Sequence, residues 1–515
     1  MNPEQLLQIT EAKIISEYGK ITGNRKISPK EWYHLFRRNI QPGLKLNEEK
    51  QELPKSYFKI PNRFKQFRIF SIRNLLTKIT NRQYMVINLL EAPFLAALLA
   101  YLTRYFPGDH YVFGENRNLV AYLFMSVVVS LFLGMMVSAE EIIKDRRILK
   151  REAFLNLSRF SYLNSKIILL FVLSAIQTIL YVWTGNWILG IKGMTFSYWL
   201  ILFSTTCFAN MVGLNISAGL NSVVAIYILI PFILVPQLLL SGTIVAFDNL
   251  NPSIASRVNV PLVGNMMTSR WTFEALAVEQ FHKNKYEQIF YPYDKEISRY
   301  GYITAYAIPT LQSELDGCLM NLVKKQKEAE TGNLFDILNH EIPALQKEAG
   351  FGSCSFMSAL NMRQFNDSVA EGVSSYLDSL SRYFSDRLSR VNVRRDAVYE
   401  RLLNKLGSDG VFQFKQDYYN NSLADLVLDK AGENKIIEGK GKLIRKKDPI
   451  FMDPISKAGN AHFYAPVKNI SGWKIDTLWF NFAIIWLMSL GLYFTLLYDV
   501  IRKTLEYFEN LKFRR

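Results

Sequence analysis

Many ionisable side chains lie close together in one charged segment, Glu140–Glu152, with the sequence EEIIKDRRILKRE. Acidic and basic side chains alternate there, so ion pairs can form along a helix at i,i+4 spacing or across to a partner protein. The residues predicted to make such pairs are Glu140, Glu141, Lys144, Asp145, Arg146, Arg147, Arg151 and Glu152. This segment predicts an interaction site, not a catalytic one.

Catalytic chemistry is not expected in this chain. Its five histidines are scattered, and no nucleophile or metal-ligand spacing accompanies them. The segment EGKGKL at 438–443 lacks both the GxxxxGK[ST] spacing and the strand-to-helix setting of a phosphate loop. We therefore expect no catalytic residue, metal or cofactor here, and any ATP chemistry must belong to another chain or another part of the protein.

Long apolar runs flank the charged segment, at 118–139 and 166–190. Each is long enough to cross about 30 Å of hydrocarbon at about 1.5 Å per residue. Four further windows pass the same test, at 84–102, 197–219, 222–246 and 477–499. The sequence predicts an all-α membrane protein with six transmembrane helices, in which 140–153 is a cytosolic elbow between helices two and three.

The formal charge of +16 is divided between segments. Residues 1–83 hold 17 Lys and Arg against 7 Asp and Glu, residues 139–166 hold 7 against 4, and residues 501–515 hold 5 against 2. All three segments fall on one side if six spans alternate, which is the positive-inside pattern with both termini cytosolic. This partition favours a multi-pass protein of the plasma or inner membrane and argues against nucleic acid as a partner.

The remaining segments divide around the spans. Residues 1–62 are predicted to be a cytosolic linker or docking segment, and residues 63–83 an amphipathic helix in the headgroup layer. Since the first 80 residues contain no cleavable leader, we expect the first span to direct insertion. Spans one to five occupy 84–247, an extracytoplasmic domain occupies 248–474, and span six at 477–500 precedes a basic tail at 501–515.

The extracytoplasmic domain is predicted to be mainly helical, of α or α+β class. One apolar stripe starts at Phe365, and if it continues to Leu406 the helix is about 60 Å long. Cys318 and Cys354 both fall in this domain, where a disulfide can persist, and two unpaired thiols are an equal alternative. The basic run at 443–449 is expected to be a solvated surface.

Several polar residues lie at membrane depth. At such positions a hydrogen bond between helices is a commoner role than facing a translocation path. These residues are Glu91, Asn210, Asn215 and Gln237. Pro231 and Pro236 predict a kink in the fifth span.

The order of these elements resembles the membrane half of ABC exporters of the G subfamily, also called type-2 ABC permeases. Two stretches support the resemblance, RNLLTKITNRQYMVINLLEAP at 73–93 and LLLSGTIVAFDNLNPSIASRVNVPLVGNMMTSRWTFEALAVEQF at 238–281. The second is similar to the family's fifth-helix exit, through Ser241, Gly242, Arg270, Trp271 and Glu274. The external domain is unusually large for that family, and Thr243 and Ile244 stand where drug- and sterol-exporting members have two bulky valve residues.

The resemblance implies a dimer of permease copies around a central path, driven by two ABC ATPase domains that bind ATP and Mg²⁺. Helices two and five would line the path. By position, the lining residues are Phe124, Ser126, Val127, Ser130, Met135, Pro231, Val235, Leu239, Thr243 and Ile244. The elbow would sit in a groove of the ATPase and transmit its closure, so charge reversal at Arg146 and Glu152 is expected to break the complex.

The expected function is the permease subunit of an ATP-driven exporter. The cargo would be apolar or amphipathic and lipid-like, because the path offers little charge. Polysaccharide export is an alternative, and so is a non-transporting anchor or receptor whose external domain binds an envelope protein. The expected partners are an ABC ATPase subunit or domain, a second permease copy and membrane lipids.

Overall fold

The structure, a computed structural model, describes residues 8–17, 21–44, 61–106, 108–152, 157–256, 258–324, 328–439 and 441–512. The chain divides into two compact units, Met1–Ile60 and Pro61–Arg515.

The first unit contains a strand pair and a capped helix. Its elements are β1 (Lys13–Ile15), the antiparallel partner β2 (Ile21–Arg25), α2 (Pro29–Asn39) and η1 (Gln41–Gly43). The Ser28 hydroxyl accepts a hydrogen bond from the Glu31 amide at 3.2 Å, and the Glu31 carboxylate accepts one from the Ser28 amide at 2.8 Å. This capping box fixes the start of α2. Residues 1–7, 18–20 and 45–60 of the predicted linker lie outside the described residues.

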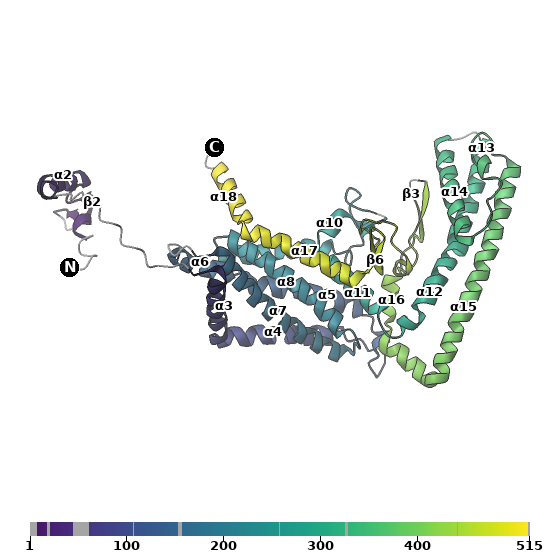
Figure 1. Cartoon of the computed structure of the whole chain (residues 1–515), viewed down its shortest axis with the longest axis horizontal. Helices are drawn as coiled ribbons and strands as arrows, with labels where there is room; N and C mark the ends of the chain where they lie inside the picture. The colour runs from purple at the N-terminus through teal and green to yellow at the C-terminus, as the bar shows by residue number, and fades with distance from the viewer. Residues whose placement is uncertain are drawn as a thin grey trace. The chain divides into compact units, whose positions relative to one another are not determined.

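The second unit is built on apolar helices that run side by side (Figure 1). They are α4 (Arg82–Thr103), α5 (Leu119–Ser138), α7 (Arg159–Leu189), α8 (Thr195–Gly219) and α17 (Thr477–Leu497). Within the described ranges, these five segments are long and apolar enough to cross a membrane. The fifth predicted span, 222–246, is the shorter α9 (Val223–Leu239), whose 17 residues stand at the lower limit for crossing a bilayer.

The helix α9 ends earlier than predicted because the backbone turns at Gly242. The φ angle there is +80°, and a Cβ would lie 2.4 Å from the ring of Phe247, so only glycine fits this turn. The chain then returns through η4 (Phe247–Asn249) and α10 (Leu262–Asn265) to α11 (Thr268–His282).

The buried helix α11 lies within the segment 248–474 that is predicted to be extracytoplasmic. It packs against α5, α8 and α17, and its side chains are buried on nearly every side. Such burial all round requires neighbours on every face, which the spanning helices provide. Residues 268–282 therefore pack as part of the helix bundle.

Close packing of α5 against α8 organises the bundle. A Cβ on Gly134 of α5 would lie 2.5 Å from the backbone oxygen of Thr206 on α8. Small residues allow such close approach between helices in membranes, where packing replaces the hydrophobic driving force.

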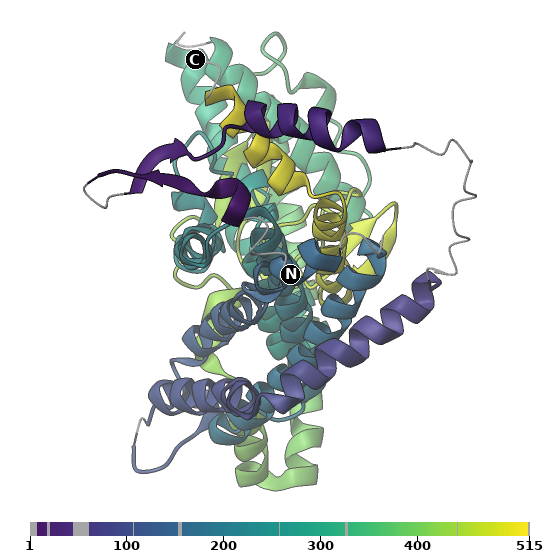
Figure 2. The ribbon, with the colours of Figure 1, turned by 90° about the vertical axis from the view of Figure 1, so that its left-hand side faces the viewer.

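We call the end of the bundle where α6 (Glu141–Glu152) joins α5 to α7 the elbow end. There α3 (Arg63–Thr80) crosses the ends of the spanning helices, and α18 (Val500–Lys512) follows α17 (Figures 1 and 2). Inward, α3 presents Gln66, Phe70 and Asn74, whereas most of its apolar side chains, Phe64 among them, are exposed. This distribution suits a helix that lies in a headgroup layer. Residue 153 of the predicted elbow and 513–515 of the predicted tail lie outside the described residues.

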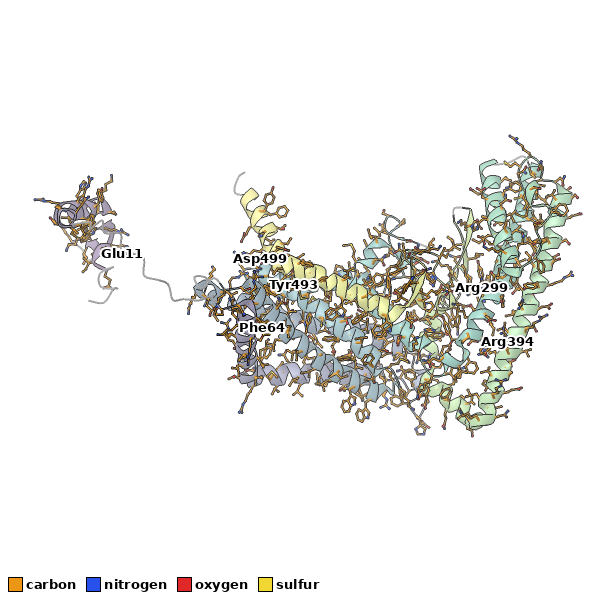
Figure 3. The ribbon with its side chains drawn as sticks, viewed as in Figure 1. Glu11, Phe64, Arg299, Arg394, Tyr493 and Asp499 are labelled. Atoms are coloured by element: carbon orange, nitrogen blue, oxygen red, sulfur yellow. The ribbon has the colours of Figure 1, made fainter. Side chains whose placement is uncertain are left out.

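The opposite end of the bundle, the far end, holds a helical layer and two hairpins (Figure 1). The helices are α12 (Glu287–Tyr302), η5 (Ile303–Ala307), α13 (Ile308–Lys324), α14 (Glu328–Ala349), η6 (Met357–Ala359), α15 (Asp367–Tyr418), α16 (Asn421–Val427) and η7 (Pro449–Phe451). The antiparallel hairpins are β3 (Ile436–Gly439) with β4 (Lys442–Arg445), and β5 (Val467–Ile470) with β6 (Trp473–Asp476). Arg299 of α12 and Arg394 of α15 mark this end in Figure 3.

The long helix α15 packs on α12 and α13 through a second apolar core. Before an interruption at Gly407, it is about 60 Å long at about 1.5 Å per residue. Cys318 and Cys354 are buried in the same core as free thiols. Of the two alternatives that the sequence left open, the structure therefore has unpaired cysteines.

Candidate functional site

Acidic side chains hold the elbow helix α6 against the bundle. Glu141 pairs with Lys78 of α3 and, at 3.1 Å, with Lys166 of α7. Asp145 pairs with the same Lys166 at 2.8 Å and accepts a hydrogen bond from the Tyr162 hydroxyl at 3.0 Å. Since Lys166 is almost fully buried, both carboxylates offset the cost of removing its charge from water.

Further bonds fix both ends of α6. Two backbone amides in its first turn donate to the Ser217 hydroxyl at 3.1 Å, at the end of α8. Arg146 donates to the backbone oxygen of Ala218 at 2.9 Å, so it caps the C-terminus of α8. Glu152 pairs with Arg73 of α3 at 3.1 Å. The elbow is thus tied to α3, α7 and α8 together.

The opposite face of α6 is basic. The exposed residues on that face are Lys144, Arg147, Ile148 and Arg151. The carboxylate of Glu140 lies beside Lys144 and accepts a hydrogen bond from the Tyr227 hydroxyl at 2.7 Å. We call Lys144, Arg147 and Arg151 the basic face.

Arg146 and Glu152, two residues predicted to couple the elbow to a partner, have bonding partners within this chain. Both side chains bond within the second unit, Arg146 to α8 and Glu152 to Arg73. The acids turn inward because the lysines of α3 and α7 need counter-charges there, and the cations at the other positions remain in solvent.

Five of the predicted path residues belong to α5. All five, Phe124, Ser126, Val127, Ser130 and Met135, are buried in the core of the bundle. The Tyr181 hydroxyl donates to the Ser126 hydroxyl at 2.9 Å, and the rings of Phe124 and Phe273 meet edge to face at 5.8 Å. The outward stripe of α5 consists instead of Ala121, Met125, Val129, Phe132 and Met136, which are exposed or half-buried.

The path residues predicted on the fifth span, 222–246, lie at an outer surface. Pro231, Val235, Leu239 and Ile244 are exposed, and Thr243 is half-buried. The helices α9 and α5 pack against each other, and each has an outward apolar stripe. We call these two stripes the apolar stripe pair.

Three of the four polar residues predicted at membrane depth bond between helices. The bonds run from Asn210 Nδ2 to Ser174 Oγ (2.7 Å), from Asn215 Nδ2 to the Leu492 oxygen (2.9 Å), and from the Ser269 amide to Gln237 Oε1 (3.0 Å). Glu91 differs from them: it is half-buried, and no hydrogen bond joins its side chain to another helix within the ranges described. These bonds fasten helices to one another and leave few polar groups for a solute.

The residues Ser241 and Gly242 form the turn after α9. The Ser241 hydroxyl donates to the Leu238 oxygen at 2.7 Å and accepts from the Thr243 amide at 3.3 Å. The hydroxyl thus satisfies backbone groups that the end of α9 leaves without helical partners.

A buried charge cluster joins α11 to β5 and α17. Glu274 is fully buried between Arg270, whose Nη2 lies 3.4 Å away, and Lys468, whose Nζ lies 2.7 Å away. Asn481 of α17 donates to the same carboxylate at 2.9 Å. The Arg270 guanidinium lies over the Trp271 ring, 3.7 Å from its centroid. Burial lowers the pKa of Lys468 to about 8.

Sequence reasoning found Arg270, Trp271 and Glu274 but missed Lys468 and Asn481. Both lie about two hundred residues further along the chain and have no distinctive neighbours. In the sequence, Lys468 is visible only as a charged residue and Asn481 only as an amide residue, both close to the start of the last span.

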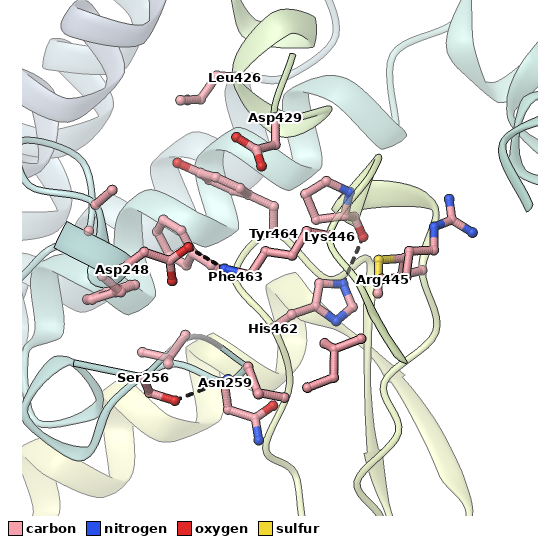
Figure 4. Close-up of a pocket in the computed structure, with 18 residues that line it drawn as sticks. Asp248, Ser256, Asn259, Leu426, Asp429, Arg445, Lys446, His462, Phe463 and Tyr464 are labelled. Carbon is pink, nitrogen blue, oxygen red and sulfur yellow. Dashed lines mark hydrogen bonds and ion pairs between the residues drawn. The ribbon is translucent and has the colours of Figure 1, made fainter. Parts of the chain in front are cut away.

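A pocket of about 210 Å³ lies at the far end of the bundle, beside Gly242 (Figure 4). Three aromatic rings form part of its wall, and the centroids of Phe463 and Tyr464 are 4.1 Å apart. Phe247 meets Phe463 edge to face at 5.2 Å. The wall beside the end of α9 is therefore mainly aromatic.

Charged and polar groups line the rest of this pocket. Lys446 pairs with Asp248, and His462 bonds through Nε2 to the Pro449 oxygen at 2.8 Å (Figure 4). Burial lowers the pKa of His462 to about 4, so this imidazole is neutral at pH 7. Arg445 and Lys446 belong to the run 443–449, which is half-buried here and not the solvated surface expected from its charge.

Part of the helix bundle matches a known protein family. Residues 65–269 match the family model described as ABC-2 type transporter, and no curated protein matches the chain. The match begins in α3 and ends at the start of α11, so it includes α6 and α9. Together with the apolar helices, it shows a multi-pass integral membrane protein and supports an ABC transporter permease.

Proposed function

We propose that this chain is the permease subunit of an ATP-driven exporter of the G-subfamily type, and that its cargo is apolar or amphipathic. The observation that most supports the proposal is the ABC-2 type match over 65–269, which contains the tied elbow helix. The elbow end would face the cytosol, where the positive-inside pattern places it. An ABC ATPase subunit or domain would bind ATP and Mg²⁺ on that side.

The basic face of α6 would dock on the ATPase. Its three cations favour an acidic groove as the complementary surface. On the other side of α6, Glu141 and Asp145 join it to α3 and α7. A displacement of α6 on ATP-driven closure would therefore move those helices as well.

The apolar stripe pair would line the path between two permease copies. On α5 it offers Met125, Phe132 and Met136, and on α9 it offers Val235 and Leu239. Apolar side chains of this kind suit acyl chains or other apolar groups, whereas a polysaccharide needs polar partners for its hydroxyls. This composition favours lipid-like cargo over polysaccharide.

Affinity purification of the full chain from its native membranes tests the proposal. The wild-type chain should retain a stoichiometric ATP-hydrolysing subunit. Reversal of two basic-face charges, Arg147→Glu with Arg151→Glu, should remove that subunit, because repulsion replaces attraction across the interface. The matched control reverses two exposed charges outside that face, Arg68→Glu with Lys503→Glu, and should retain it.

Two results would contradict the proposal. If the ATPase subunit stays bound after reversal of Arg147 and Arg151, the basic face is not the docking surface. If no ATPase accompanies the wild-type chain, the exporter proposal is wrong. That result would favour a membrane anchor whose far end binds an envelope protein.

A further inference from the structure

A cavity of about 430 Å³ lies at the elbow end, on the side of α6 that faces the bundle. Its walls come from α3, α6, the start of α7, the end of α8 and the start of α18. Asp499, which precedes α18, and Phe64, which begins the exposed face of α3, mark this end in Figure 3. None of the residues used for the proposed path lines this cavity.

Four cations line the cavity, Arg146, Lys150, Arg159 and Arg502. Arg502 is close enough to both Arg146 and Arg159 to repel each of them electrostatically. Like charges gathered around one cavity favour an anion between them, since an anion relieves their mutual repulsion.

The acids at the cavity cancel only part of this charge. Glu152 is paired with Arg73 at 3.1 Å, and Asp499 is paired with Arg159. Among the described residues, Arg146 bonds to neutral groups alone, the Ala218 oxygen and the Asn221 side chain. Arg502 bonds to Glu506 on the exposed side of α18 at 2.8 Å. The cavity thus keeps an excess of positive charge.

The rest of the wall is apolar. Phe70 of α3, Leu149 of α6 and Leu157 before α7 line the cavity together with the cations. A free inorganic anion gains nothing from such a surface, whereas a ligand with a charged head and a hydrocarbon body gains from both parts of the wall. The outer face of α3 carries further exposed apolar side chains that a headgroup layer would cover.

We propose that this cavity binds an anionic phospholipid of the cytosolic leaflet. Its phosphate would accept hydrogen bonds from Arg146, Arg502 and Lys150, and its first acyl carbons would lie against Phe70 and Leu149. The bound lipid would join α18 to α6. The ion pairs of Glu141 join α6 to α3 and α7 but do not reach α18. The inference rests on the proposed cytosolic placement of the elbow end but not on transport or on any ATPase.

Lipid binding to the detergent-solubilised full chain tests this inference. Short-chain phosphatidylglycerol, short-chain phosphatidylcholine and inorganic phosphate are titrated separately, and binding is measured by native mass spectrometry and calorimetry. The test variant is Lys150→Ala with Arg502→Ala. The matched control is Arg151→Ala with Lys503→Ala, which removes the same charge from adjacent positions of the same two helices outside the cavity.

Phosphatidylglycerol should bind the wild-type chain more tightly than phosphatidylcholine. The test variant should bind it roughly tenfold or more weakly, since two charge-assisted hydrogen bonds are lost, and the control should match the wild type. Equal weakening in both variants would mean general surface attraction and would overturn the inference. Inorganic phosphate that binds as tightly as phosphatidylglycerol, with the same loss in the test variant, would overturn the assignment to a lipid.

Discussion

Replacing Glu274 with glutamine should strongly destabilise the helix bundle. The side chain of Glu274 is fully buried, and two cations, Arg270 and Lys468, share its carboxylate at 3.4 and 2.7 Å. Glutamine keeps the shape and an oxygen for Asn481, so the change isolates the charge. Removing one partner of a buried ion pair costs about 3–5 kcal/mol, because the remaining charge stays desolvated.

Thermal unfolding of the detergent-solubilised chain, followed by tryptophan fluorescence, measures this effect. Glu274→Gln should lower the unfolding temperature by several degrees. Glu279→Gln, on the same helix, is the control, because Glu279 is half-buried and accepts one hydrogen bond from Ser197 at 2.8 Å. A second change, Lys468→Met, should restore part of the lost stability, since it removes one of the stranded cations. Equal unfolding temperatures for the two glutamine variants would refute the reasoning.

Three further predictions concern the elbow, the turn after α9 and pH. Glu141→Gln should speed amide hydrogen exchange in α6 at least tenfold, because Lys78 and Lys166 lose a shared partner; unchanged exchange would show that Glu141 does not anchor the elbow. Gly242→Ala should cost about 1–3 kcal/mol of unfolding free energy, from its φ of +80° and the contact with Phe247, and an unfolding temperature equal to the wild type would contradict this. The pKa of Lys468, lowered to about 8, lies below the ordinary value of 10.5, so the unfolded chain binds more protons between these pH values. Stability should therefore rise by up to about 1.4 kcal/mol per pH unit above pH 8, and parallel pH profiles for wild type and Lys468→Met would exclude this origin.

The spanning helices could be predicted from the sequence because length and apolar composition are local properties. The main exception, α9, ends at a turn that depends on the contact between Gly242 and Phe247. Burial of α11 could not be predicted either, since its neighbours α5, α8 and α17 come from distant parts of the chain.

The side-chain assignments required tertiary structure. In a span as uniformly apolar as α5, the side that faces other helices has the same composition as the side that faces lipid, so Phe124 and Phe132 could not be told apart. The direction of Glu141 depends on Lys78 and Lys166, which lie in other helices. Lys468 completes the cluster around Glu274 from far along the chain, and no local pattern announces it.

Cysteine labelling of α6 in native membranes tests most directly whether a partner ATPase meets the elbow. Arg147→Cys and Lys503→Cys place single exposed thiols on the basic face and on α18, while Cys207, Cys318 and Cys354 are buried. If the basic face docks on an ATPase, Arg147→Cys should resist a maleimide reagent and should cross-link to a subunit containing GxxxxGK[ST]. Lys503→Cys should be labelled readily. Equal labelling at both positions, with no cross-linked ATPase, would contradict it.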